Sequence, residues 1–298
     1  MKLSYIIQPT DNFINVKEVL KTRLQVSDRL LLKLKKEQKI LLNNVQCFVW
    51  SQVKNNDIIE ILINSDEDNS NILATKMNLN ILYEDEAYLV INKPSGLPIH
   101  PSMDHYTDSL SNGLKYYFDT ISLHKKIRPV NRLDKNTSGI VIFAKNEYIQ
   151  ECLIKQMQTN TFSKEYIAIC NGIFSEKSGT INLPISRREN SIIERCIDEN
   201  AGALSITHYE VLEEYYHEEY PYSVVKCQLE TGRTHQIRVH MQAIGHSLIG
   251  DTLYGTSSPL INRQALHAYQ VKFIHPITKQ KVNYIAPLPQ DMRKLCNI

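Results

Sequence analysis

Apolar residues recur at helical spacing near the start of the chain and in short strand-like runs after it. Over residues 16–34 they return every three or four positions, which predicts two short helices, with Ser27 as the N-cap of the second. The runs ILLNNVQCFVW (40–50) and DIIEILI (57–63) predict small strands, with Asn43 and Asn44 as the turn after the first. Residues 65–80 are polar, locally acidic and without periodicity, which predicts a linker.

The stretch Arg128–Asn146, RPVNRLDKNTSGIVIFAKN, joins a polar loop to an apolar run. The run Ile140–Ala144 is rich in β-branched residues and predicts a strand that is covered on both faces. Gly139, just before it, is free to adopt backbone conformations closed to other residues. The carboxylate of Asp134 stands between cations in the loop, which indicates a chemical site. A second interpretation is that Asp134 closes a turn by accepting backbone N–H bonds.

The rest of the chain predicts further strands and helices from the same two patterns. We expect strands over 88–91, 164–170 and 223–229, a helix starting near Thr107 or Asp108, a helix that buries Ile149, Cys152, Leu153 and Met157, and a helix from about Thr234. Residues 180–220 alternate between polar turns and short strands, and we assign them no function. Lys93 and His100, in a loop rich in Pro and Gly, either contact phosphate or stabilise the fold.

Composition is that of an ordinary soluble globular protein, with 42% hydrophobic and 22% charged residues. The first residues, MKLSYIIQPTDNF, lack a basic region followed by a long apolar run, so we expect a cytoplasmic location. The six cysteines form no CxxC pair and are expected to be reduced core residues. No Cys/His cluster has the spacing of a zinc site, so we expect no metal.

The net charge of the whole chain is only +2, but one segment has a clear excess of basic residues. Residues 17–39 contain eight Lys and Arg against three Asp and Glu. Nucleic-acid binding would therefore depend on this local surface. The candidate RNA-binding residues there are Arg23, Arg29, Lys33 and Lys36. The simpler alternative is a solvated helix face.

Several ordered motifs resemble those of the RluA-type RNA pseudouridine synthases. RLDKNTSG (132–139) resembles the family signature that contains the catalytic aspartate, and GRTHQIRVH (232–240) resembles a second strong motif. NKPSGLPIHP, KEYIA, GDTLYG and LHAY add weaker matches in the same order, so the resemblance covers roughly residues 80–290. One departure is Asn131, where many relatives have His. The helix, helix, strand order near the N-terminus resembles an S4-type RNA-binding domain.

The resemblance implies a role for each matched residue. Asp134 would be the catalytic group, Arg238 its partner, and Tyr166 an active-site residue against the target base. Arg132 would hold the flipped nucleotide. The further substrate-binding candidates are Asn131, Thr137, Lys164, Arg233 and His235. The residues of GDTLYG and LHAY are expected to be structural.

The fold expected from the short strands, the few helices and the resemblance is α+β, with a mixed, largely antiparallel sheet. We expect three parts: an S4-like RNA-binding domain (1–65), a linker (66–80) and a pseudouridine synthase catalytic domain (81–298). The acidic linker would be repelled by phosphates, so we expect it to connect the two modules without lining the RNA path. We expect a monomer.

The chemistry of the family breaks the bond from ribose C1′ to N1 of uracil and rejoins the base through C5. This isomerisation needs no redox step, so we expect no cofactor. The uridine must first be flipped out of its stack. An adjacent guanidinium would keep a buried Asp134 ionised. Whether Asp134 attacks C1′ or C6, or removes the C2′ proton, stays open, as does removal of the C5 proton by Tyr166.

Two other functions remain as alternatives. One is a noncatalytic RNA-binding or ribosome-assembly protein on the same fold. The other is a nucleoside or glycoside hydrolase, although such enzymes usually place two carboxylates around the sugar. For the synthase, ribosomal RNA is the expected substrate and transfer RNA the alternative.

Overall fold

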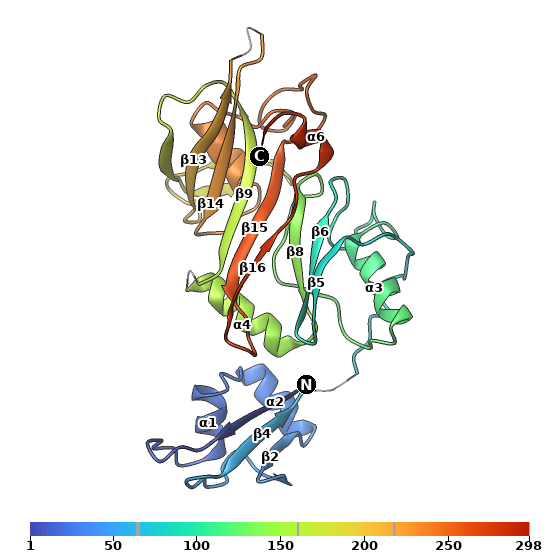
Figure 1. Cartoon of the computed structure of the whole chain (residues 1–298), viewed down its shortest axis with the longest axis vertical. Coiled ribbons are helices and arrows are strands. Elements are labelled where there is room, and N and C mark those ends of the chain that lie inside the picture. The colour runs from blue at the N-terminus through green and yellow to red at the C-terminus, as the bar shows by residue number, and fades with distance from the viewer. Residues whose placement is uncertain (64–65, 160, 217–218, 298) are drawn as a thin grey trace.

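One large sheet forms the body of the protein, and a smaller unit lies at the N-terminal end (Figure 1). The computed structural model describes residues 1–63, 66–159, 161–216 and 219–297. The large sheet has ten strands, and most of its pairs are antiparallel. In spatial order they are β10 (Ser178–Asn182), β13 (Ile206–Tyr215), β14 (Tyr222–Leu229), β9 (Ser163–Asn171), β15 (Leu266–Ile274), β8 (Ser138–Ala144), β6 (Tyr88–Lys93) and β5 (Ile81–Glu84), with β16 (Lys281–Ile285) paired to β15 and β7 (Arg128–Pro129) paired to β8. This mixed sheet confirms the predicted α+β class.

Strand β8 lies in the middle of the sheet, and all seven of its residues are buried, as its apolar run predicted. It pairs in parallel with β15 over Ser138 and Gly139. Gly139 has φ 111°, and a Cβ atom there would lie 2.3 Å from the carbonyl oxygen of Ala268. The two halves of the sheet therefore meet at a point that only glycine permits.

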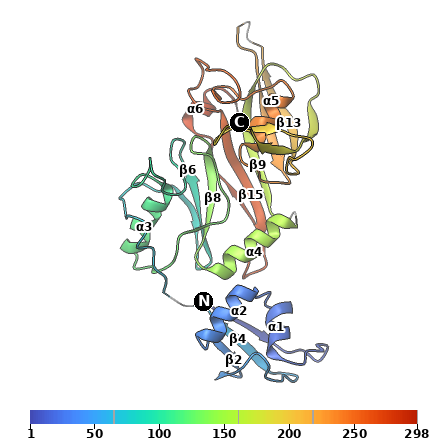
Figure 2. The same cartoon turned by 180° about the vertical axis from the view of Figure 1, so that it is seen from behind.

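Four helices accompany this sheet in the described part of the chain (Figures 1 and 2). They are α3 (Leu110–Thr120), α4 (Glu147–Gln158), α5 (Gln236–Ala243) and α6 (Gln290–Arg293). Helix α3 starts later than predicted because Ser109, and not Thr107 or Asp108, is its N-cap and forms a capping box with Asn112. Helix α4 buries Ile149 and Leu153, and α5 buries its apolar face as predicted.

The N-terminal unit packs two helices on a four-stranded sheet. Its elements are β1 (Lys2–Ile6), α1 (Val16–Thr22), α2 (Asp28–Lys36), β2 (Ile40–Leu42), β3 (Val45–Gln46) and β4 (Ile58–Leu62), in the sheet order β1-β4-β2-β3. The predicted cap is confirmed, since Ser27 accepts a hydrogen bond from the Leu30 N–H. Asn43 and Asn44 have φ 53° and 65°, as the predicted β2–β3 turn requires. Strand β1 was not predicted, because none of its five residues is buried and its short apolar pattern is weaker than that of β4, in which three of five residues are buried.

Residues 66–80 contain neither helix nor strand and connect the two modules through side chains. Glu67 forms ion pairs with Lys33 of α2 at 3.6 Å and with Arg128 of β7 at 2.6 Å. Lys33 also pairs with Glu147 of α4 at 2.9 Å. The segment is therefore held against both modules. The expected boundary at Ser65 and the chain end at Ile298 lie outside the described residues, and the domain limits stay a prediction.

The segment 180–220 contains one strand that is longer than predicted. Strand β13 has ten residues, while β11 (Ile185–Arg187) and β12 (Arg195–Ile197) form a short separate hairpin. Residues 217 and 218 of this segment lie outside the described residues. Among the helices of the described ranges, none combines the length and apolar composition needed to cross a membrane.

Candidate active site

The loop between β7 and β8 presents Asp134 at the start of the central strand. The carbonyl of Asp134 accepts a hydrogen bond from the Thr137 N–H at 3.0 Å, so the turn is closed by the backbone. The carboxylate instead accepts one bond, at Oδ2, from Arg238 Nη1 at 3.2 Å. Its Oδ1 makes no hydrogen bond with any described residue. The interpretation of the Asp134 carboxylate as a turn-closing group is therefore wrong.

Lys93 and Asn131 hold this loop through its backbone. The Lys93 side chain is fully buried, and its Nζ donates to the carbonyls of Pro94, Leu97 and Lys135, each at 2.9 Å. Burial lowers the pKa of Lys93 to about 7. Of the two interpretations of Lys93, stabilisation of the fold is the right one. The Asn131 amide donates to the carbonyl of Ile140 and accepts from the N–H of Ile142, both within β8.

Both polar atoms of the Asn131 side chain are therefore bonded to the backbone of β8. These hydrogen bonds give no support to its expected role in substrate binding. Thr137 is buried and accepts a bond from Gln264 Nε2 at 3.3 Å. His100 is exposed and lies 3.3 Å from the Ser111 hydroxyl. The roles of Thr137 and His100 toward a substrate stay predictions.

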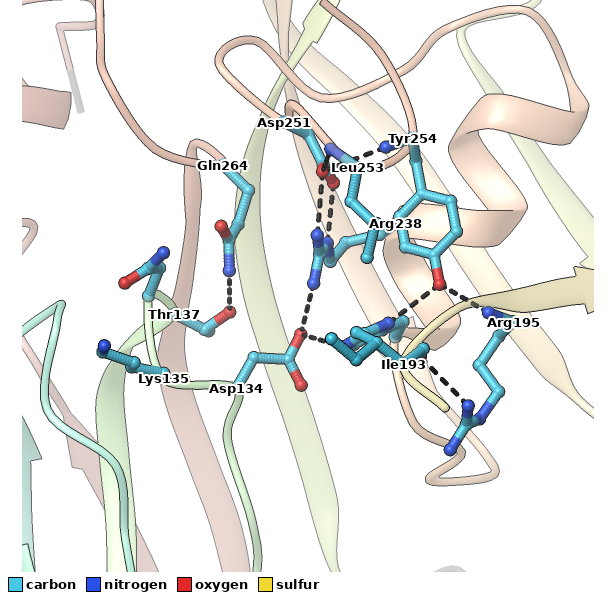
Figure 3. Close-up of polar contacts among 12 residues, drawn as sticks. Asp134, Lys135, Thr137, Ile193, Arg195, Arg238, Asp251, Leu253, Tyr254 and Gln264 are labelled. Carbon is cyan, nitrogen blue, oxygen red and sulfur yellow. Dashed lines mark hydrogen bonds and ion pairs between the residues drawn. The ribbon is translucent and has the colours of Figure 1, made fainter. Parts of the chain in front are cut away.

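Arg238 of α5 lies between two carboxylates, as Figure 3 shows. It donates Nε and Nη2 to Asp251 at 2.6 and 2.8 Å, and Nη1 to Asp134. Its guanidinium carbon also lies 4.9 Å from the centre of the Tyr254 ring. Burial works to lower the pKa of Arg238, but the bonds to both carboxylates outweigh it and the pKa is raised. The expected contact of Arg238 with Asp134 is present, yet its main partner is Asp251.

Asp251 and Tyr254 come from GDTLYG, whose residues we expected to be structural, and both contact the site. Asp251 also accepts from the backbone N–H groups of Leu253 and Tyr254. The Tyr254 hydroxyl accepts from the Arg195 N–H and lies 2.8 Å from His235 Nδ1. Sequence reasoning missed this support. The available signal was the order of the motifs, because no spacing along the chain relates residue 251 to residue 238.

His235 stands at the start of α5 in a left-handed conformation, with φ 58°. Its Nε2 lies 3.8 Å from Asp134 Oδ2, beyond hydrogen-bonding distance. Burial lowers the pKa of His235; the charge of Asp134 opposes this shift, and that of Arg238 adds to it. The ring is therefore neutral at pH 7, and Arg238 is the charged partner of Asp134.

Tyr166 of β9 forms a wall of the cavity next to Asp134. Only 8% of it is exposed, and its hydroxyl makes no hydrogen bond with any described residue. Burial and the nearby charge of Asp134 raise the pKa of Tyr166. The phenol is therefore protonated at neutral pH and offers a ring face and an O–H donor. A proton-abstracting role for Tyr166 would first require its phenol to ionise.

A small cavity of about 60 Å³, called the inner cavity below, adjoins a groove of about 640 Å³. Both are lined by Arg132, Leu133, Asp134, Tyr166, Leu229 and Arg233. The groove continues past Lys164 to Met157 and Gln158 of α4. Arg132, Lys164 and Arg233 form no ion pair with the described residues, and burial lowers the pKa of Lys164. The groove thus offers unpaired cations around a small, partly apolar cavity.

The four expected RNA-binding residues of the N-terminal unit divide into two pairs. Arg23 pairs with Asp11 at 2.5 Å, and Lys33 pairs with Glu67 and Glu147. These contacts occupy both cations within the protein, so the structure does not support them as RNA ligands. Arg29 and Lys36 are exposed and form no ion pair with any described residue. Within the described ranges, no three His, Cys, Asp or Glu side chains are grouped to hold a metal ion.

Comparison with known proteins decides the family. Residues 87–243 match the model of the RNA pseudouridylate synthase family. The chain belongs to the RNA pseudouridylate synthase family. It is an RNA pseudouridine synthase, which is an isomerase. Its relatives include the uncharacterized RNA pseudouridine synthase YhcT of Bacillus subtilis, 39% identical over 93% of this chain and 91% of the relative.

Two further similarities extend the comparison. Ribosomal large subunit pseudouridine synthase D of Neisseria meningitidis is 34% identical over 88% of this chain and 72% of that protein. The solved structure of human RNA Pseudouridylate Synthase Domain Containing 1 has a TM-score of 0.58 and 29% identity, covering 71% of this chain and 84% of that one. Asp134, Tyr166 and Arg238 lie within residues 87–243, which match the family model, whereas Asp251 and Tyr254 lie beyond them.

Proposed function

We propose that this synthase converts specific uridines of ribosomal RNA to pseudouridine, with Asp134 as the catalytic group. The observation that carries the proposal is the Asp134 carboxylate, which faces the cavity with one oxygen free and the other bonded to Arg238. The Asp134 side chain is 25% exposed, and the Arg238 guanidinium offers it an opposite charge at 3.2 Å. Asp134 is thereby positioned to act as a base or nucleophile toward a bound uridine.

The reaction is an isomerisation within one nucleotide. The bond from ribose C1′ to uracil N1 breaks, the base turns, and C1′ bonds to C5. C5 then loses its proton while N1 gains one, so no atom is added or removed. Asp134 starts the reaction at C1′, C6 or the C2′ proton. The chemistry needs no oxidant and no external donor, so we propose that no cofactor takes part.

The target uridine enters the inner cavity after flipping out of its stack, at a cost of a few kcal/mol. Arg132 lines both the inner cavity and the groove, is exposed and forms no ion pair with the described residues, and it fills the vacated space or contacts a phosphate. Lys164 and Arg233 line the groove and meet the flanking backbone, since unpaired cations are the usual phosphate ligands. Tyr166 packs against the base, and its protonated hydroxyl donates a hydrogen bond.

The RNA class is argued from the relatives. The relative named ribosomal large subunit pseudouridine synthase D of Neisseria meningitidis is matched over 72% of its own length, and this supports ribosomal RNA. Transfer RNA is the second candidate. We further propose that residues 1–65 form an S4-like RNA-binding domain, in which Arg29 and Lys36 are the available cations, and that residues 66–80 link it to a catalytic domain over 81–298. The expected monomer and the cytoplasmic location stay predictions.

The test is pseudouridine mapping of total RNA from cells that lack this protein, complemented with wild type or with Asp134→Asn. We expect a discrete site to disappear, to return with wild type, and to stay absent with the variant, whose activity on that RNA should fall at least about 1,000-fold. The matched control is Asp119→Asn, which changes an exposed carboxylate of α3 paired only with Lys115 and should restore the site.

Three results would contradict the proposal in different ways. Restoration by Asp134→Asn would remove Asp134 from the catalytic role. The absence of any changed site, together with RNA binding by the purified protein, would support the noncatalytic alternative. Release of free uracil from RNA would identify a hydrolase. A changed site in transfer RNA would keep the mechanism and replace only the substrate.

A further inference from the structure

Two aromatic rings stand exposed and stacked on the N-terminal unit. Phe48 and Trp50 have ring centroids 4.6 Å apart and planes within 4° of parallel. They are 62% and 66% exposed although each covers one face of the other. Their outer faces are therefore open to solvent. Large apolar groups that cluster on a surface indicate a binding site more often than single ones do.

The rings are presented by a turn that is firmly attached to α1. Val49, between them, is buried, and its carbonyl accepts the Lys17 N–H at 2.9 Å. The Ser51 carbonyl accepts the Val16 N–H at 3.0 Å, and the Ser51 hydroxyl accepts the Phe48 N–H at 3.2 Å. Because these bonds order the backbone beforehand, a ligand that stacks on the rings has little ordering cost to overcome.

The charge around the rings favours an anionic partner. Residues 1–63 contain ten Lys and Arg against six Asp and Glu, and residues 40–56 contain no acidic residue. Asp11, Asp28 and Glu60 form ion pairs with basic residues of the same unit. Lys17, whose backbone N–H bonds to the Val49 carbonyl of the turn, is exposed. It forms no ion pair with any described residue. Exposed aromatic faces on a turn bonded to the backbone of an unpaired lysine suit a nucleotide, which offers a base to stack and a phosphate to pair.

We propose that Phe48 and Trp50, called the aromatic platform below, bind an unpaired nucleotide of the RNA substrate, with Lys17 at its phosphate. This inference rests on the proposed RNA-binding function of the N-terminal unit. The platform takes a single-stranded residue, because bases in a duplex already stack on each other. It provides a contact separate from the cavity that holds the target uridine.

The chain offers a direct readout, because Trp50 is its only tryptophan. The full-length protein is titrated with an oligoadenylate of about twelve nucleotides, with an RNA duplex of equal length and with heparin, while Trp50 emission is followed. We expect the single strand to quench the emission and the duplex and heparin to leave it nearly unchanged. Equal quenching by heparin would mean that the signal reports charge alone, and would overturn the proposal.

Variants test the energetic contribution of the rings. Affinity is measured by the fluorescence anisotropy of an end-labelled oligoadenylate, because the Trp50 variants lack the tryptophan signal. Phe48→Ala and Trp50→Ala should each weaken single-strand binding between about 5- and 150-fold, whereas Trp50→Phe should retain most of the affinity. Lys17→Gln should lower the slope of log affinity against log salt by about one. Leu32→Ala is the matched control, since Leu32 is 65% exposed on α2 and offers no aromatic face.

Two further outcomes would overturn the proposed role of the aromatic platform. One is unchanged single-strand affinity in both alanine variants, and the other is a wild-type protein whose sedimentation shows a dimer that Trp50→Ala dissociates. Pseudouridine formation by the same preparations separates this failure from that of the proposed function. If wild type and Trp50→Ala modify RNA equally well with equal affinity, only the platform is wrong. If wild type modifies no RNA, the proposed function itself has failed.

Discussion

Arg238 bonds two carboxylates, Asp251 and Asp134, which are fixed in the protein in different ways. Asp251, on the inner side, is 1% exposed and accepts four hydrogen bonds at its own oxygens. Asp134, on the groove side, accepts one, while its loop is fixed through backbone atoms bonded to Lys93 and Asn131. A carboxylate that only supports a structure has its oxygens satisfied. One that is available for chemistry is positioned by its backbone and keeps an oxygen free.

The largest expected loss of stability from a substitution comes from removing Asp251. Asp251→Ala leaves the Arg238 guanidinium buried with one remaining carboxylate, and losing one partner of a buried ion pair typically costs about 3–5 kcal/mol. Asp134→Asn removes the charge from the acceptor of a single bond at a more exposed side chain and should cost less than about 1.5 kcal/mol. Urea unfolding of both variants measures the difference. Equal losses of stability would contradict the contrast between the two sides.

A second test of this contrast changes the backbone that positions the Asp134 loop. In Gly139→Ala the new Cβ would meet the Ala268 carbonyl at 2.3 Å in a backbone conformation with φ 111°. We expect a loss of about 1–3 kcal/mol in stability and reduced activity, because the Asp134 loop must shift. Thermal unfolding and pseudouridine formation are the measurements. Gly96→Ala is the control, since it also has positive φ but nothing lies within 4 Å of the added atom.

Per unit of pH, the smallest expected effect comes from Lys93. Its pKa is lowered to about 7 by burial in the folded protein, while the unfolded chain keeps the ordinary value of 10.5. Between these values the unfolded state binds more protons, so the free energy of unfolding should rise with pH by up to about 1.4 kcal/mol per unit, and below pH 7 this contribution is flat. Lys93→Met should lose this rise.

Urea titrations of wild type and Lys93→Met across this pH range provide the measurement. The difference in slope between the two proteins is the quantity to compare, because other groups titrate equally in both. Parallel curves would mean that the three carbonyl bonds keep Lys93 charged throughout. The groove side would then be held by a permanent ammonium.

Much of the architecture was accessible from local pattern. The buried run of β8, the Ser27 cap and the Asn43–Asn44 turn depend on neighbours within a few residues, and the structure confirms each of them. Strand β1 was missed and α3 begins later than expected, because a short pattern and a choice among Thr107, Asp108 and Ser109 leave the local signal ambiguous.

The sequence and its family resemblance predicted most of the elements, the fold class and the motif residues that belong in one site, including the contact between Asp134 and Arg238. Only the tertiary structure decided the other charge partners. In the folded protein the main partner of Arg238 is Asp251, and Lys93 donates hydrogen bonds to backbone carbonyls. Arg23 and Lys33 form ion pairs with carboxylates of the protein itself. The physical reason is range. Periodicity and capping act along a few residues, whereas ion pairing and burial depend on distances that exist only after the chain has folded.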